Sequence, residues 1–276
     1  MPWHAHLSVE YTRQDSRTVA RHSHEGPLRI LQTLYPEGDG VAHNVLVHPP
    51  SGLVGGDTLD IEVHARSGTH GFITTPGAAR FYRSDAEPAV QRARVQMESG
   101  ARLEWLPLEA LAYSGCIAEN HLLIDLQPGA EIMGWDVLGL GLPAAGQPFV
   151  RGTFLQHLEV TGHWLEHGRI AALDARLMDG PLGLAGRRCL ATLFFACGEA
   201  IAEKRREQVL ALANDAIAAC DAQVIAGATA PGPNVIVVRA LSGVVEPAMH
   251  LLKTIHAAWR PAVWALPAIS SRLWAL

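Results

Sequence analysis

The residues of this sequence best suited to hold a cation lie in a glycine-rich stretch, His48–Gly68 (HPPSGLVGGDTLDIEVHARSG). Within it, Asp57 follows directly after Gly55 and Gly56, and a segment with strand-like alternation comes next. A glycine-rich loop that cradles phosphate needs the N-terminus of a helix behind it, so phosphate binding is not expected. Two hypotheses stay open for Asp57: a turn residue whose carboxylate bonds nearby amides, or a ligand for a passing metal ion.

Two further carboxylates, Glu104 and Asp136, fall on expected strands later in the chain. Together with Asp57 and His48 they supply carboxylate oxygens and an imidazole, which are ordinary metal ligands. These residue types are therefore candidates for contact with a passing metal ion. The sequence does not decide whether Glu104 and Asp136 face solvent or line an interior channel.

Histidine is abundant, with 14 residues, but no set has the spacing of a closed metal site. His163 and His167 lie four apart, which brings two imidazoles together on a helix, yet TGHWLEHG around them predicts a β-hairpin. We therefore expect scattered surface and turn histidines. P-loop, HExxH and GxSxG motifs are absent from the sequence, so we expect none of the corresponding enzyme classes.

A second group of candidates lies in the run ARFYRSD, where Arg80, Tyr82 and Arg83 occur close together. Tyrosine and arginine are enriched where proteins bind one another. The alternative is a strand end with its arginines in solvent. The run is therefore a candidate interaction surface.

The elements that position these residues follow a repeat of roughly thirty residues. Three segments end at Gly68, Gly100 and Gly129, and each has apolar residues three, five and seven positions before its glycine. The nine apolar positions are Ile61, Val63, Ala65, Ala93, Val95, Met97, Leu122, Ile124 and Leu126. This period of two predicts half-buried strands that end in Ser-Gly or Pro-Gly turns.

The repeat predicts a mainly β fold of stacked or spiral β-layers, like a β-helix, over residues 1 to about 195; an ordinary β-sandwich is the alternative. Two helices are expected in the C-terminal third, near Glu199–Ala219 and Glu246–Arg260, with Pro261 ending or kinking the second. A strand is expected between them at Asn234–Leu241. The lack of a long polar linker predicts one domain, residues 1–276.

Composition narrows the class of protein further. Hydrophobic residues make up 49% of the chain and charged residues 18%, enough to bury a large core. The formal net charge of -5 argues against a nucleic-acid partner. Four cysteines without a CxxC pair, no signal-peptide pattern and no apolar run long enough to cross a bilayer predict a soluble cytoplasmic protein.

Several blocks of the sequence resemble, in order, those of the urease accessory protein D family (UreD, called UreH in some organisms). The blocks are HPPSGLVGGDTL, FITTPGAARFYRS, GARLEWLPLEALAYSG and AEIMGWDVLGLGLPAAGQPFVRG, with SSRLWAL at the end. The family motifs fall on Gly55, Gly56, Asp57, Thr75, Tyr82, Arg83 and Glu104, and on Arg272 and Trp274 near the C-terminus. The resemblance covers almost the whole chain, from about Gly26 to Leu276.

The resemblance implies a protein that is not an enzyme. Such proteins are chaperones that bind apo-urease together with an F-type accessory protein and a G-type accessory protein, a GTPase. The complex helps to insert nickel into the urease active site, and the D-type protein is thought to provide an internal passage for the ion. From this resemblance we predict a path along which nickel binds weakly and transiently, with no tightly bound cofactor. The residues predicted to contribute to it are Asp57, Glu104, Asp136 and His48. Two other functions stay open: a β-solenoid hydrolase, for which Asp57 and Glu104 would be the carboxylate pair, and a docking protein without a metal path.

Overall fold

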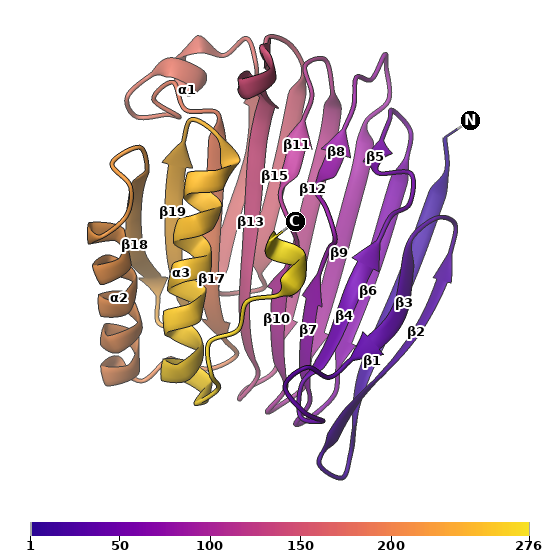
Figure 1. Ribbon diagram of the computed structural model, residues 1–276, viewed down its shortest axis with the longest axis vertical. Helices are drawn as coiled ribbons and strands as arrows, with labels where there is room; N and C mark the ends of the chain where they lie inside the picture. The colour runs from indigo at the N-terminus through magenta and orange to yellow at the C-terminus, as the bar shows by residue number, and fades with distance from the viewer. Residues whose placement is uncertain (1, 276) are drawn as a thin grey trace.

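The computed structural model describes residues 2–275, which form two facing β-sheets with helices against one of them (Figure 1). Sheet A contains, in spatial order, β16 (Trp164–Ala171), β15 (Thr153–Val160), β12 (Ile117–Leu126), β9 (Ala89–Met97), β6 (Thr58–Ala65), β1 (His4–Gln14) and β2 (Arg17–Glu25). Sheet B contains β18 (Ile225–Gly232), β19 (Val235–Ser242), β17 (Cys189–Cys197), β13 (Glu131–Leu142), β10 (Arg102–Leu106), β7 (His70–Thr74), β4 (Ala42–Val47) and β3 (Arg29–Leu34). Four short strands, β5 (Gly52–Leu53), β8 (Ala79–Phe81), β11 (Ala110–Ala112) and β14 (Gln147–Pro148), extend sheet B at one end of the molecule.

The centre of the molecule is a parallel β-solenoid, which confirms the predicted stacked layers. The chain runs down β6 in sheet A and up β7 in sheet B, and it repeats this course through β9 with β10 and through β12 with β13. Successive layers pair in parallel, with Ile61 beside Ala93 and Ala93 beside Leu122. Of the nine predicted inward positions, eight are buried and Leu126 packs against the same core while partly exposed.

The glycine turns of the repeat stack on one another at the end of the molecule opposite β5, β8 and β11. Gly68, Gly100 and Gly129 have φ of +68°, +73° and +81°, a left-handed conformation that strains residues with a Cβ. A Cβ on Gly129 would lie 3.4 Å from the backbone nitrogen of Gly100. The repeated glycine therefore satisfies both the turn conformation and the close approach of adjacent layers.

The parallel solenoid gives way to antiparallel pairing at both sides. β15 and β16 form the predicted hairpin, β2 pairs with β1, and β17, β19 and β18 continue sheet B. The predicted strand at Asn234–Leu241 is observed as β19. The antiparallel strands extend the two-sheet core beyond the solenoid layers.

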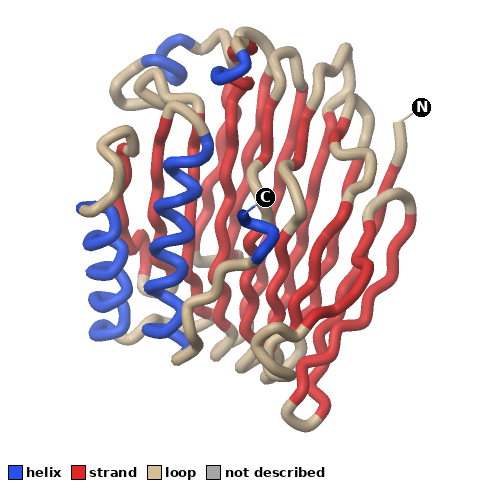
Figure 2. The backbone as a smooth tube through the Cα atoms, viewed as in Figure 1, coloured by secondary structure: helices blue, strands red, loops and turns tan. Residues whose placement is uncertain are grey.

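Helices α2 (Glu203–Ala218) and α3 (Val245–Trp264) pack against the outer face of sheet B, over β17 to β19 (Figure 2). A second apolar core lies beneath them. Both were expected, but α3 continues through Pro261, because the following turn buries Val263 and Trp264. A short α1 (Ala175–Asp179) was not predicted. Two 3-10 turns are also present, Pro143–Ala145 and Arg272–Ala275.

Candidate functional site

Asp57 closes a tight turn at the end of the solenoid that carries β5. Its side chain accepts hydrogen bonds from the backbone N–H of Val54 (2.9 Å) and of Trp3 (3.2 Å), and the residue is only 2% exposed. Gly56 has φ of +88°, and a Cβ on Gly55 would collide with Ser84 Oγ. The carboxylate therefore acts as a turn residue, and its role as a metal ligand stays a prediction.

His48 lies close to Asp57 and lines a cavity of about 320 Å³ that opens between the two sheets. Burial lowers the pKa of His48, and the nearby Asp57 carboxylate opposes this shift only in part. Its Nε2 is enclosed and has no hydrogen-bond partner among residues 2–275. His48 is therefore held toward the neutral form, in which an imidazole binds metal ions. The inner wall of the cavity includes Gln91 and Trp105.

Asp136 points from β13 into the space between the sheets. Asn120 Nδ2 donates a hydrogen bond to Asp136 Oδ2 (2.7 Å), and Gln156 Nε2 donates to Oδ1. Burial, with a smaller effect from the Glu166 carboxylate, raises the pKa of Asp136 to about 7, although the Asn120 hydrogen bond opposes the shift. The two donors are neutral amides, so the charge of this carboxylate has no cationic hydrogen-bond partner.

A run of amide side chains connects Asp136 to the cavity at His48. Gln91, Asn120 and Gln156 stand side by side on β9, β12 and β15, and Gln91 Nε2 donates to Asn120 Oδ1 (3.2 Å). These three amides were not predicted from the sequence. The feature that could have marked them is an amide at an inward position of a strand whose other inward residues are apolar. A polar side chain buried there needs a hydrogen-bond partner, so such amides are expected to lie next to one another or to another polar group.

Glu104 lies on the opposite face of sheet B, beneath α3, and is fully buried. It accepts hydrogen bonds from His256 Nε2 (2.7 Å) and His70 Nε2 (3.0 Å), and from Arg260 Nε (3.0 Å). Burial by itself would raise the pKa of Glu104, but the hydrogen bonds from His256 and His70 outweigh it and hold the pKa well below its ordinary value. Glu104 is thus kept ionised by its surroundings.

Arg260, which is also fully buried, extends this group into what we call the α3 ion network: Glu104, Arg260, Glu37, His43, His70 and His256. Its guanidinium forms two hydrogen bonds with Glu37 (2.7 and 2.8 Å) and also donates to the carbonyl oxygen of Pro267 (2.6 Å). His43 contacts the same Glu37 carboxylate at 2.7 Å. The network joins α3 to β4, β7 and β10, and Glu104 is its one member that was selected from the sequence.

The four residues predicted to contribute to one metal path are therefore not all brought together. His48 and Asp57 lie at one opening between the sheets and Asp136 lies between the sheets, but Glu104 faces α3. The sheet itself separates Glu104 from Asp136, because alternate residues of a strand point to opposite faces. Within residues 2–275, no group of three or more His, Cys, Asp or Glu side chains is arranged to hold a metal ion.

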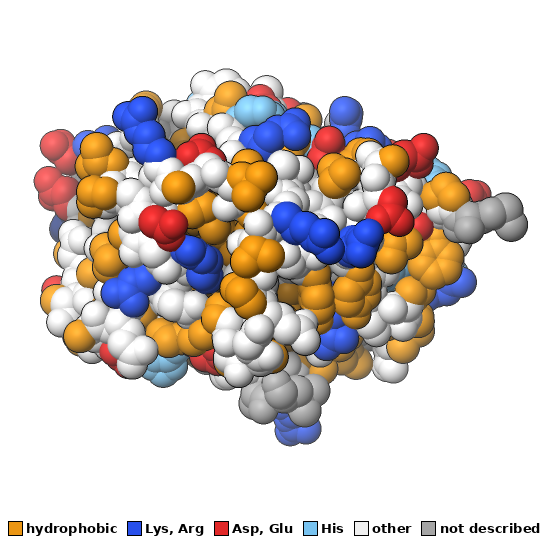
Figure 3. All heavy atoms as spheres, turned by 90° about the horizontal axis from the view of Figure 1, so that it is seen from above, with side chains coloured by type: hydrophobic (Ala, Val, Ile, Leu, Met, Phe, Trp, Pro, Cys, Tyr) orange, Lys and Arg blue, Asp and Glu red, His pale blue; other side chains and the backbone are white. Residues whose placement is uncertain are grey.

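The predicted interface residues of the second block lie at the end of the molecule that carries β8, where Figure 3 shows basic and hydrophobic side chains intermingled. Arg83 is exposed and pairs with Asp85 (3.2 Å). Tyr82 is half-buried against Tyr113, with ring centroids 4.8 Å apart. Thr75 Oγ1 accepts a hydrogen bond from Leu108 N (2.8 Å). Of these, Arg83 offers the most accessible side chain.

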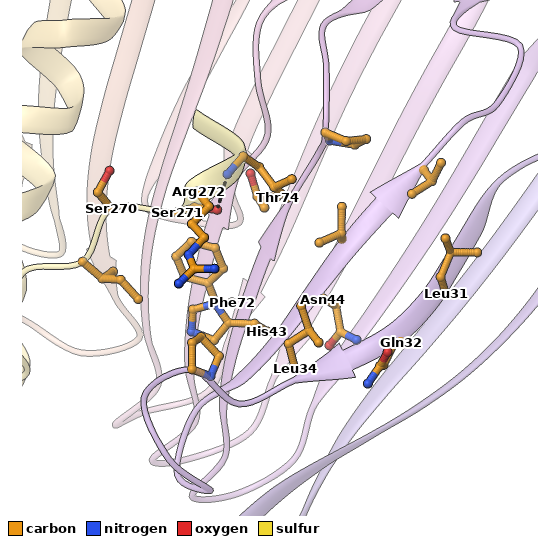
Figure 4. Close-up of a pocket in the computed structure, with 16 residues that line it drawn as sticks. Leu31, Gln32, Leu34, His43, Asn44, Phe72, Thr74, Ser270, Ser271 and Arg272 are labelled. Atoms are coloured by element: carbon orange, nitrogen blue, oxygen red, sulfur yellow. Dashed lines mark hydrogen bonds between the residues drawn. The ribbon is translucent and has the colours of Figure 1, made fainter. Parts of the chain in front are cut away.

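The C-terminal segment crosses the outer face of sheet B and forms one wall of an apolar groove of about 730 Å³ (Figure 4). Trp274 is buried beside Phe72, and its Nε1 donates to Thr74 Oγ1 (3.0 Å), so this end of the chain is anchored. Arg272 is exposed and lines the groove. The opposite wall includes Leu31 of β3, which is 78% exposed.

The structure thus defines a class: a β-solenoid extended by antiparallel strands, with two helices on one sheet. Residues 4–275 match the family described as UreD urease accessory protein. The chain is 61% identical to the urease accessory protein UreD of Variovorax paradoxus and 57% identical to that of Polaromonas naphthalenivorans, in both cases over 100% of each chain. The same-named protein of Methylibium petroleiphilum is 44% identical over 99% of each chain.

This chain therefore belongs to the UreD urease accessory protein family, which supports a role in urease maturation. No helix within residues 2–275 is long and apolar enough to cross a membrane.

Proposed function

We propose that this protein is a non-catalytic scaffold that binds apo-urease together with an F-type accessory protein and a G-type GTPase, and that it assists nickel insertion. Similarity over the full length of proteins named urease accessory protein UreD carries this proposal. We favour this proposal over the hydrolase alternative because the two carboxylates nominated for hydrolysis have other partners. Asp57 is engaged by turn amides, whereas Glu104 is engaged by histidine and arginine under α3.

We further propose that nickel passes between the two sheets. The ion enters at His48, whose neutral imidazole lines the opening. It then moves along amide oxygens to Asp136, the carboxylate that lacks a cationic hydrogen-bond partner. Neutral amides bind a divalent ion weakly, which suits a path from which the ion must leave. Each additional 1.4 kcal/mol of affinity would lower the equilibrium release about tenfold.

The passage is tested by the substitution Asp136→Asn. Asp125→Asn is the matched control, because it makes the same change at an exposed aspartate on β12. Cells expressing apo-urease, the F-type and G-type proteins and each variant are grown in limiting nickel. We expect Asp136→Asn to lower the nickel content of purified urease several-fold while Asp125→Asn leaves it unchanged. Equal nickel content of urease from cells with the unmodified chain, Asp136→Asn and Asp125→Asn, with the complexes intact, would refute the passage.

The apolar groove is the surface that we propose for a partner accessory protein. It combines exposed Leu31 and Leu34 with a wall from the anchored C-terminal segment (Figure 4). Burial of such a patch contributes roughly 25 cal/mol per Å² of apolar surface. We expect Leu31→Arg to abolish co-purification with the F-type or G-type protein, and Leu173→Arg, at a leucine that is 83% exposed elsewhere, to leave it intact. Full retention by Leu31→Arg would exclude the groove.

A further inference from the structure

Three histidines form a lateral row on the face of sheet A that points away from sheet B. His121 on β12 stands beside His157 on β15, and His157 stands beside His167 on β16. Phe154 and Leu158 of the same strand are buried in the core. Each lies an odd number of positions from His157, so strand alternation directs His157 to the opposite, outer face. This face has no part in the proposed passage, which lies on the other side of sheet A.

Two of these imidazoles meet nitrogen to nitrogen. His157 Nδ1 and His167 Nδ1 are 3.0 Å apart, and the ring planes are inclined by 75°. The partner of the other ring nitrogen of His157 is Glu159, whose Oε2 lies 2.8 Å from Nε2. An ionised carboxylate only accepts hydrogen bonds, so this contact holds the His157 proton on Nε2. The lone pair of Nδ1 is therefore directed at His167.

The contact between Glu159 and His157 Nε2 is of the kind that orients histidine ligands of metal ions. Histidine ligands in proteins commonly donate their second N–H to a carboxylate, which fixes the tautomer and raises the basicity of the ligating nitrogen. Without metal, His167 must place its proton on Nδ1 to hydrogen-bond His157. With metal, that proton moves to His167 Nε2, and because His167 is exposed, solvent can accept and return it.

The spacing of the nitrogens is close to that of two ligands of one ion. With metal–nitrogen bonds of about 2.1 Å, nitrogens 3.0 Å apart subtend an angle of roughly 90° at the ion. This is the angle between neighbouring ligands in octahedral or square-planar coordination, which Ni²⁺ and Cu²⁺ adopt. In the metal-free protein the 3.0 Å separation belongs to the hydrogen bond between the rings, so both rings must turn for their Nδ1 lone pairs to converge on the ion.

We propose that His157 and His167 form an exchangeable chelating site for a divalent transition ion, Ni²⁺ or Cu²⁺, on the outer face of sheet A. Two protein ligands leave the other coordination positions to water, which is consistent with the absence of a three-ligand group in the described part of the chain. Binding is accordingly weaker than at a closed site and reversible. The proposal does not depend on the proposed function, because its test needs no urease and no partner protein.

The test is binding of Ni²⁺ to the purified full-length chain by isothermal titration calorimetry, together with Cu²⁺ electron paramagnetic resonance at one equivalent. His157→Gln and His167→Gln should each weaken the strongest Ni²⁺ site at least tenfold. Glu159→Gln should weaken it by about tenfold, the lower end of the effect of removing a carboxylate that orients a ligating histidine. His163→Gln removes an exposed imidazole from the turn of the same hairpin and serves as the matched control, with unchanged affinity expected.

The resonance spectrum gives a readout that a change in folding alone would not produce. The unmodified chain should show two equatorial imidazole nitrogens on Cu²⁺, and His167→Gln should show one. The proposal is overturned if His157→Gln and His167→Gln bind Ni²⁺ as the unmodified chain does, or if His163→Gln weakens binding equally. Loss of affinity with an unchanged nitrogen count would also overturn it.

Discussion

Two carboxylates on opposite faces of sheet B, Glu104 and Asp136, are enclosed by protein in contrasting ways. Glu104 is fully buried and contacts Arg260 and two histidines, His256 and His70; the two histidines outweigh the effect of burial and hold its pKa well below the ordinary value. Asp136 is partly buried, its hydrogen-bond donors within residues 2–275 are the amides of Asn120 and Gln156, and burial raises its pKa to about 7. Similar chemical groups therefore have opposite electrostatic states.

The contrast separates the structural role of Glu104 from the transport role that we propose for Asp136. A carboxylate already saturated by cations has little left to offer a passing ion, and removing its partners is costly. One that is solvated by neutral amides can still gain by binding a cation. The pH dependence also has opposite sign. The stabilisation from Glu104 is lost as pH falls through its lowered folded pKa, whereas that from protonated Asp136 is lost as pH rises toward about 7.

The largest effect is expected from Arg260→Leu, which would leave Glu104 and Glu37 buried without their shared cation. We expect the free energy of unfolding to fall by about 3 to 5 kcal/mol, as for other broken buried ion pairs. Chemical denaturation at neutral pH measures it. Arg66→Leu is the matched control, since Arg66 pairs with Glu10 and Glu98 at the surface, where solvent screens such pairs and they contribute little to stability. Comparable losses in both variants would contradict a structural role for the α3 ion network.

The next effect concerns Asp136→Asn, which removes the titrating group but keeps its shape. An aspartate with a folded pKa of about 7 and an ordinary pKa of 3.8 makes folding less favourable as pH rises between these values. We expect the stability of the unmodified chain, relative to the variant, to decline by about 2 kcal/mol between about pH 5 and pH 7. Parallel denaturation series at several pH values measure the difference. A constant difference would show that Asp136 is ionised throughout.

The smallest effect is expected from Glu166→Gln. The Glu166 carboxylate contributes to the raised pKa of Asp136, after burial. Its removal should shift the midpoint of the pH dependence downward and change stability by less than about 1 kcal/mol, because the Arg239–Glu166 pair is only partly buried. Carbon-detected NMR titration of the Asp136 carboxyl follows the midpoint directly. An upward shift of the Asp136 titration midpoint would show that the Glu166 carboxylate does not contribute to the raised pKa of Asp136.

Much of the fold could be predicted from the sequence because it depends on local periodicity. Alternation in each repeat placed eight of nine apolar residues in the core, and the recurring glycines marked the stacked turns. The continuation of α3 through Pro261 was not predictable in this way. It depends on burial of Val263 and Trp264 against residues distant in sequence.

The candidate site was predicted only in part. Residue type alone made Asp57, Glu104, Asp136 and His48 candidate cation ligands, but it does not tell which side of a strand faces which layer. The amides beside Asp136 escaped notice because a lone Asn or Gln on a strand has no distinctive spacing. The same holds for His157 and His167, which become neighbours only through the register of a hairpin.

By itself, the sequence determined the repeat, the strands, the approximate helices and the family, because each follows from residues near one another or in fixed order. Only the tertiary structure decided that Glu104 would meet Arg260, 156 positions away, while Asp136 would meet amides from the facing sheet. The physical reason is that the charge state of a buried carboxylate depends on the partners that surround it. Those partners are assembled by the pairing of distant strands and the packing of α3.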